Sequence, residues 1–371
     1  MNRSTFRRAV APTAAALALG LSLTACGAGN EKSSSSSSSS ASGGANLSGT
    51  LNGAGSSAQE AAQGAWTAGF QQANSGATVN YDPSGSGAGV EQFQAGAVNF
   101  AGSDAYLDDK GLTDSKKVCA GKTAIEVPSY ISPIALVYNL QGVDKLQLSP
   151  DTVAKIFAGK ITKWNDSAIK ADNPNATLPS ESITAVHRSD DSGTTKNFTD
   201  YLHQTAAGTW TAAAAETWPF KSGEGANGTS GVVEAVKNGK GAIGYADASQ
   251  AGDLGVASVK VGNAYVAPTA AAAAKAADVS KRVPGRADND MALQVNRTTT
   301  EAGAYPLVLI SYVMACPTYK DAKTADLVKS YLTYAVSSAG QAAAAKAAGS
   351  APLSSSLSSD ATDAVKQISA K

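Results

Sequence analysis

The sequence predicts an α/β protein with a parallel sheet, arranged as two domains joined by two crossovers. The first observation is a repeated unit of strand, glycine-rich turn and helix that begins near residue 46, and this repeat is typical of α/β layering. The second observation is a pair of long apolar runs, at 133–139 and 305–316, with a further α/β stretch between them. We therefore expect one domain made of both chain ends and a second domain inserted between them.

The elements follow in order along the chain. Residues 47–52 read as a strand, 53–57 as a tight turn and 58–72 as a helix, in which Trp66 and Phe70 are four residues apart and share one face. The later predicted elements are a strand at 77–81, a glycine-rich turn at 85–89, a helix at 90–97, a strand at 98–101, a helix at 152–157, a helical pattern opening at 192–202, a strand at 242–245 and a helix at 321–334.

The N-terminus predicts export and lipid attachment. A basic segment with three arginines precedes an apolar segment at 9–23, and Leu23-Thr24-Ala25-Cys26 fits the lipobox of bacterial lipoproteins. We expect residues 1–25 to be a signal peptide that is cleaved before Cys26, whose sulfur then carries a diacylglyceryl group in a thioether, with palmitate as an expected acyl group of the lipid anchor. The alternative is an ordinary signal peptide with a chance cysteine.

Residues 26–45 read as a tether between the lipid and a globular body. They include eight consecutive serines at 33–40, a composition that buries no apolar surface and behaves as a flexible linker. No later apolar run reaches the roughly 20 residues that a membrane span needs. We therefore expect an extracytoplasmic body that only lipid holds at the cell membrane.

The overall composition fits such a body and excludes one class of partner. Apolar residues make up 43% of the chain and charged residues 16%, which is enough for a sizeable core. Without residues 1–25 the chain has three more acidic than basic residues. This balance gives no basis for binding nucleic acid.

The cysteine count predicts a disulfide. With Cys26 used for lipid, Cys119 and Cys316 remain as an even pair in an oxidising compartment. A bond between them is the expectation, and two separately buried thiols are the alternative. Neither cysteine has metal-ligand spacing around it, so no metal is expected.

The most informative stretch is 187–198, His-Arg-Ser-Asp-Asp-Ser-Gly-Thr-Thr-Lys-Asn-Phe. A Ser-Gly-Thr turn that opens a helix offers free backbone N–H groups, two hydroxyls and the positive end of the helix dipole. Arg188 adds a planar fork of donors suited to a tetrahedral oxyanion. The segment reads as a cradle for a phosphate-type anion.

Three other segments could contribute to the same site. Gly53-Ala54-Gly55-Ser56-Ser57-Ala58 and Ser84-Gly85-Ser86-Gly87 are glycine-rich turns that open helices, and Gly102-Ser103-Asp104 places a carboxylate just after a strand. Each alone has a structural explanation, since such turns are common and Asp104 could be an N-cap. Sheets of this class gather strand-to-helix turns along one edge, where ligands bind. Their joint occurrence favours a ligand site.

Three other functions have partial signals in the sequence. Gly53-x-Gly-x-x-Ala58 with Asp82 after the next strand also fits a dinucleotide-binding fingerprint, but an exported protein meets little nicotinamide cofactor. Gly121-Lys122-Thr123 mimics the end of a P-loop, but Lys116 stands where the first glycine belongs. The chain has two histidines, which leaves little for a hydrolytic triad or a zinc site. We therefore expect no enzyme and no cofactor.

These four motifs, in this order, resemble the substrate-binding lipoproteins of bacterial phosphate ABC importers, over nearly the whole mature chain. The resemblance implies a type II periplasmic-binding-protein fold with the ligand cleft between two lobes. Lobe I would be 46–138 plus 297–371, and lobe II the inserted 139–296. It also implies capture of inorganic phosphate by lobe closure and delivery to the permease subunits.

The resemblance also implies which residues touch phosphate. The family's contacts carry over to these positions: Ser56, Ser57, Ala58, Ser86, Asp104, Arg188, Ser192, Gly193 and Thr194. Ala58 is a departure, since relatives often have an aromatic residue there, which puts side-chain shielding of the pocket in doubt. Asp104 would select phosphate, because a carboxylate can accept a hydrogen bond from protonated phosphate and sulfate has no proton to donate.

The sequence leaves two other classes of protein open. An exported phosphomonoesterase would use the same cradle but needs a nucleophile with a base, or metals. A surface adhesin or signalling lipoprotein would need no buried anion site.

Overall fold

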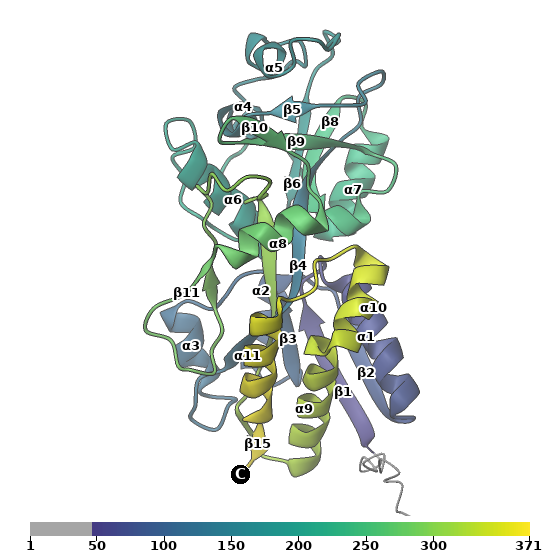
Figure 1. Ribbon diagram of the computed structural model, residues 1–371, viewed down its shortest axis with the longest axis vertical. Coiled ribbons are helices and arrows are strands. Elements are labelled where there is room, and N and C mark those ends of the chain that lie inside the picture. Colours follow the sequence, from purple (N-terminus) through teal and green to yellow (C-terminus); the bar gives the residue numbers. More distant parts are fainter. Residues whose placement is uncertain (1–46) are drawn as a thin grey trace, which may run out of the picture. The chain divides into compact units, whose positions relative to one another are not determined.

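The central sheet takes strands from both ends and from the middle of the chain. The computed structural model describes residues 47–371. Eleven strands form one sheet, in the order β2-β1-β3-β13-β4-β8-β6-β7, with β9 paired to β4 and also to β5 and β10 (Figure 1). The strands of this sheet are β1 Ser48–Gly55, β2 Gly76–Asp82, β3 Phe100–Ser103, β4 Ile125–Tyr138, β5 Gln147–Leu148, β6 Thr184–Arg188, β7 Glu224–Ala226, β8 Ala242–Asp247, β9 Gly255–Val261, β10 Ala264–Val266 and β13 Val308–Ala315.

Helices cover the sheet and confirm the predicted α/β class. They are α1 Glu60–Ala73, α2 Ser86–Gln94, α3 Asp109–Ser115, α4 Pro150–Phe157, α5 Ser167–Asp172, α6 Gly193–Thr205, α7 Gly228–Asn238, α8 Ala270–Asp278, α9 Ala322–Val336, α10 Ser338–Ala348 and α11 Ser355–Lys366, with a 3-10 turn η1 at Ala248–Gln250. Two small sheets pair β11 Lys281–Arg282 with β12 Leu293–Gln294, and β14 Thr318–Tyr319 with β15 Ser369–Ala370.

The sheet is mixed, which corrects the prediction of a parallel one. β1 pairs in parallel with β2 and β3, and β6 in parallel with β7 and β8. In the middle, β13 runs antiparallel to both β3 and β4, and β4 antiparallel to β8. The repeated strand–turn–helix unit therefore predicts the two flanks correctly. The repeat does not predict the directions of β4 and β13. The chain passes from one flank of the sheet to the other in β4 and returns near β13, so these two strands run antiparallel.

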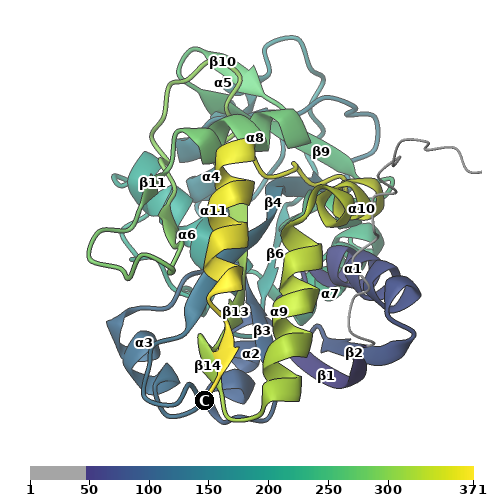
Figure 2. The same cartoon turned by 60° about the horizontal axis from the view of Figure 1, so that its bottom comes forward.

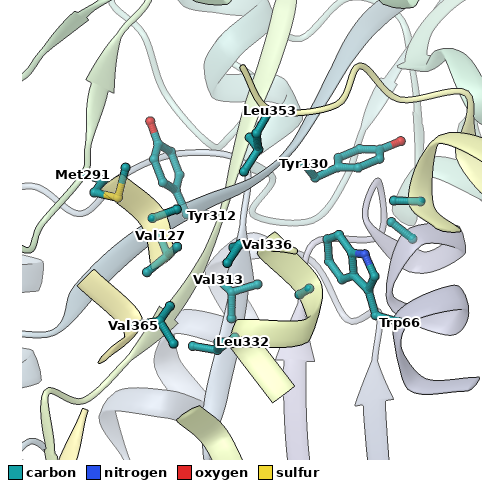
Figure 3. Close-up of a cluster of buried hydrophobic side chains, with 14 of the residues drawn as sticks. Trp66, Val127, Tyr130, Met291, Tyr312, Val313, Leu332, Val336, Leu353 and Val365 are labelled. Atoms are coloured by element: carbon teal, nitrogen blue, oxygen red, sulfur yellow. The ribbon is translucent and has the colours of Figure 1, made fainter. Parts of the chain in front are cut away.

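β4 connects two hydrophobic clusters. Its first part, up to Pro133, pairs with β13, and residues 134–138 pair with β8. The first cluster packs α1, α9 and α11 against β13 and the start of β4, and Figure 3 shows Trp66, Val127, Val313 and Leu332 meeting there. The second cluster packs α4 and α6 against β8, β9 and the end of β4. Segment 273–295 contributes side chains to the first cluster. The lobe boundary at 296 stays a prediction.

The C-terminal helices pack against the apolar face of α1, which is the face that the four-residue spacing of Trp66 and Phe70 predicts. Trp66 and Phe70 are both buried in the first cluster, and Trp66 Nε1 donates to the Gly340 carbonyl oxygen at 2.9 Å. Figure 2 shows α9 beside α11, and both helices contribute to this cluster. The start of α1 is joined to β13 by Gln59, whose Nε2 donates to the Tyr312 carbonyl oxygen at 2.9 Å, and this contact matters for the site below.

A disulfide joins Cys119 and Cys316, as predicted, with their Cα atoms 4.9 Å apart. It lies in a small apolar cluster with Phe93 and Met314. Within residues 47–371, no helix is both long and apolar enough to cross a membrane. The predicted signal peptide and the lipidated Cys26 lie outside the described residues.

Candidate functional site

The predicted site begins at the turn between β1 and α1, which only glycine can make. Gly55 has a φ of +143°, and a Cβ there would lie 2.0 Å from the Gly102 carbonyl oxygen. That close approach lets Ser56 N donate to Gly102 O at 2.8 Å. The end of β1 and the end of β3 are therefore locked together, and Ser56 comes next to Asp104.

Asp104 is the centre of the site. It is 2% exposed, and its Oδ1 accepts from Ser56 Oγ at 2.6 Å. Its Oδ2 accepts from Thr194 Oγ1 at 2.8 Å, and its backbone N–H donates to Ser86 Oγ at 3.2 Å. All four predicted segments thus meet at Asp104.

The fourth segment, β6 and the turn after it, supplies the cation. Arg188 is 2% exposed, and its Nε donates to Asp190 Oδ1 at 2.7 Å while Nη2 bonds Asp190 Oδ2. Burial alone would raise the pKa of Asp190, but the Arg188 guanidinium and the Gly228 amide together hold that pKa below its usual value. Two of the five guanidinium N–H groups serve Asp190, so the others stay available to an anion.

The first turn of α6 lies against Asp104. Ser192 caps the helix, with its Oγ accepting from Thr195 N at 3.2 Å. A helix leaves its first N–H groups without intrahelical partners, and here these belong to Gly193 and Thr194. A Cβ on Gly193 would lie 2.7 Å from Ser86 Oγ and 2.9 Å from Asp104 Cβ. Only a glycine permits this approach.

The structure brings all nine predicted residues together, and all nine are buried. Most of them have internal hydrogen-bond partners, and at Ser56 and Ala58 these partners leave no side-chain hydroxyl or backbone amide for a ligand. The Ser56 hydroxyl donates to Asp104 and accepts from Ala58 N at 3.1 Å and Gln59 N at 3.4 Å. One donor and two acceptor positions are all that a hydroxyl has, so Ser56 acts on Asp104, and the Ala58 amide acts on Ser56.

A further helix N-terminus, that of α7, also reaches the site and was missed by sequence reasoning. Thr229 N donates to Ser57 Oγ at 3.0 Å, and Thr229 Oγ1 lies 3.0 Å from the same oxygen. Gly228 N donates to Asp190 Oδ1 at 3.0 Å. The signal was present, since Gly228-Thr229-Ser230-Gly231 is a glycine-rich turn opening a helix, like the two that were recognised.

Two further residues have no such signal. Asn197, one turn into α6, donates to the Asp104 carbonyl oxygen at 2.6 Å, and Ser311, within β13, donates to Asp104 Oδ1 at 2.6 Å. Both lie inside regular elements, where an isolated polar residue gives no local pattern. Among residues 47–371, no group of three potential metal ligands is close enough to hold an ion.

The chain was compared with known proteins. Residues 40–339 match the family model described as a PBP superfamily domain. Phosphate-binding protein PstS 3 of Mycobacterium tuberculosis is 37% identical over 289 residues, covering 76% of this chain and 77% of the relative. Phosphate-binding protein PstS 2 of the same species is 36% identical over 293 residues, covering 77% and 79%.

Solved structures agree with the fold. A high-affinity periplasmic phosphate-binding protein, PfluDING, solved with phosphate, superposes with a TM-score of 0.68 at 24% identity, covering 84% of this chain and 92% of that one. A phosphate ABC transporter substrate-binding protein from Clostridium perfringens gives a TM-score of 0.59 at 19% identity, covering 81% and 98%. The family match over most of the chain, together with the mycobacterial relatives, shows that the chain belongs to the PstS family of phosphate-binding proteins.

Proposed function

We propose that this protein is an extracytoplasmic receptor that binds inorganic phosphate and delivers it to the permease of an ABC importer. It is a binding protein rather than an enzyme. The names of its relatives and its membership in their family support this function. The geometry adds the chemical reason.

The observation that carries the proposal is the buried Asp104 carboxylate among donors. Asp104 accepts from hydroxyls on both oxygens, and the Arg188 guanidinium and the α6 amides belong to the same site. Protonated phosphate can donate a hydrogen bond to a carboxylate, whereas sulfate is fully ionised at neutral pH. Sulfate would leave the acceptor unmatched and facing an anion, a loss of at least ~1–3 kcal/mol, or at least about tenfold in affinity.

The remaining ligand contacts follow from which donors are uncommitted. Arg188 has guanidinium N–H groups that Asp190 does not use. We infer that these groups, together with the amides of Gly193 and Thr194, donate to the bound anion. Ser57, Ser86 and Ser192 add hydroxyls. The site contains two carboxylates and one guanidinium, so we infer that hydrogen bonds and the α6 dipole contribute much of the affinity. No cofactor takes part.

We further propose that lobe closure buries the ligand. The predicted lobes, 46–138 plus 297–371 and 139–296, would rotate about β4 and the segment before β13. Bonds such as Thr194 to Asp104 and Thr229 to Ser57 link residues of the two predicted lobes, and they support a closed form. Opening would break these bonds and admit phosphate.

The partners proposed are the permease subunits and the membrane, through lipid alone. Family membership supports a transporter partner. The anchor would be Cys26, beyond the described residues, followed by the tether at 26–45, which raises the receptor's effective concentration near the permease.

Isothermal titration of residues 46–371 with phosphate, sulfate and arsenate tests the proposal. The protein is first unfolded and refolded to remove carried-over ligand. We expect one tight phosphate site and far weaker sulfate binding. A protein that binds neither anion, or both equally, would contradict the function.

A further inference from the structure

A chain of buried hydrogen bonds ends at Asp104. Tyr331 Oη donates to Gln63 Oε1 at 2.7 Å, and Gln63 Nε2 donates to Gln59 Oε1 at 2.8 Å. Gln59 Nε2 then donates to Ser311 Oγ at 2.5 Å, and Ser311 Oγ donates to Asp104 Oδ1 at 2.6 Å. Four elements, α9, α1, β13 and the end of β3, are connected in this way.

The chain runs through the apolar interior and not along the surface. Gln59, Gln63, Ser311 and Tyr331 are each 0% exposed, and Tyr331 belongs to the first hydrophobic cluster. A buried polar group without a partner costs free energy comparable to a lost hydrogen bond. Replacing the whole set of polar side chains by apolar ones of similar size would avoid that cost, so packing alone does not require a polar chain here.

The direction of the chain is fixed by one backbone carbonyl. Gln59 Nε2 also donates to the Tyr312 carbonyl oxygen at 2.9 Å. Because a carbonyl can only accept, the nitrogen of the Gln59 amide must face β13, and its oxygen must face Gln63. Burial raises the pKa of Tyr331 well above its usual value, so the phenol keeps its proton. Every donor along the chain therefore points toward Asp104.

The chain makes the two oxygens of Asp104 unequal. Oδ1 accepts from both Ser56 and Ser311, at 2.6 Å each, whereas Oδ2 accepts from Thr194 alone among residues 47–371. A carboxylate oxygen has about two acceptor positions. Oδ1 is therefore saturated by the protein, and one acceptor position is left on Oδ2.

We propose that the Tyr331–Gln63–Gln59–Ser311 chain fixes the orientation of Asp104 so that Oδ2 alone accepts the proton of bound phosphate. These four residues are positioning residues for anion selectivity, and this role rests on the function proposed above. Without the chain, the carboxylate can turn about its Cβ–Cγ bond, and the acceptor is no longer held where the ligand proton arrives. Phosphate then binds more weakly, and sulfate, which makes no use of the acceptor, changes less.

The test measures the ratio of sulfate to phosphate Kd in Ser311→Ala and Gln59→Met, by isothermal titration. Gln341→Met is the matched control. Gln341 is also a buried glutamine, and its Nε2 donates to two backbone carbonyls, of Ser129 and Ala335. Among the described residues, its side chain bonds no site residue. Unfolding free energies of the ligand-free proteins are measured alongside.

We expect the Kd ratio to fall by about tenfold in Ser311→Ala and Gln59→Met, mostly through weaker phosphate binding. Gln341→Met should lose a similar amount of stability and keep the wild-type ratio. An unchanged ratio in both chain variants, with wild-type selectivity intact, would overturn the chain's role and leave the function standing. Should Gln59→Met not fold, Gln63→Met, one link further from Asp104, takes its place. A wild-type protein that does not discriminate would overturn both proposals.

Discussion

Asp104 and Arg188 lie in two halves of one site, but their supports come from very different distances along the sequence. Asp104 is held by Ser56, 48 positions away, and by Ser311, 207 positions away. Arg188 is held by Asp190, two positions away, and the α6 turn is capped by Ser192 onto Thr195, three positions away. The Arg188 half is built largely from local turns, and the Asp104 half from a network across the fold.

This difference indicates a division of labour. A local turn can present charge and backbone donors to an anion before the rest of the site forms. Placing one acceptor against one ligand proton requires the surrounding packing to fix a side chain from several sides. We therefore expect changes in the Arg188 half to alter affinity for both anions, and changes in the Asp104 half to alter the preference between them.

The largest expected effect is that of Arg188→Ala. Phosphate affinity should fall by about 100-fold or more, because the anion loses its guanidinium and Asp190 is left partly buried without its cation. Sulfate affinity should fall in parallel. Lys196→Ala is the control, since that side chain is 33% exposed and its nitrogen is 3.7 Å from Glu216, and it should change affinity by less than about threefold. Equal effects in titration would mean that Arg188 is structural.

Gly193→Ala should have the next largest effect. Its Cβ would lie within 3.0 Å of Ser86 Oγ and Asp104 Cβ, so the two halves could not approach fully. We expect phosphate affinity to fall by about tenfold or more. Gly64→Ala in α1 is the control, because a Cβ there meets nothing within 4 Å, and it should keep affinity while raising stability by ~0.5–1 kcal/mol. Wild-type affinity in Gly193→Ala would contradict the close approach.

Removal of the disulfide should have the smallest effect on binding. The bond closes a loop across 197 positions, so Cys119→Ser with Cys316→Ser should lower the free energy of unfolding by about 2–5 kcal/mol. Within residues 47–371, the apolar cluster around the two cysteines includes none of the predicted site residues, so phosphate affinity should stay within about twofold. Denaturant unfolding and titration of the same sample would check both. A large loss of phosphate affinity would mean that the disulfide helps to position Asp104 and the residues that hold it.

The same contrast explains how much the sequence could predict. The turns at 53–58 and 188–194 are visible because glycine, serine and arginine follow one another before a helical pattern, and their residues do meet in the site. The flanks of the sheet follow from the same repeat, but the antiparallel β13 does not, since its direction depends on how the chain returns. Gln59 and Ser311 were missed because a polar residue inside a helix or strand shows its role only when its distant partner is placed.

The Asp104→Asn variant tests the central claim most directly, since it keeps the shape of the side chain. In one orientation, the asparagine amide would present an N–H donor to phosphate in place of an acceptor. In the other orientation, the N–H would face a hydroxyl that now donates to Asp104. Titration with phosphate and sulfate should show phosphate affinity reduced by about tenfold or more and the preference over sulfate diminished. Unchanged affinity and unchanged preference would contradict the assignment of Asp104 as the residue that selects phosphate.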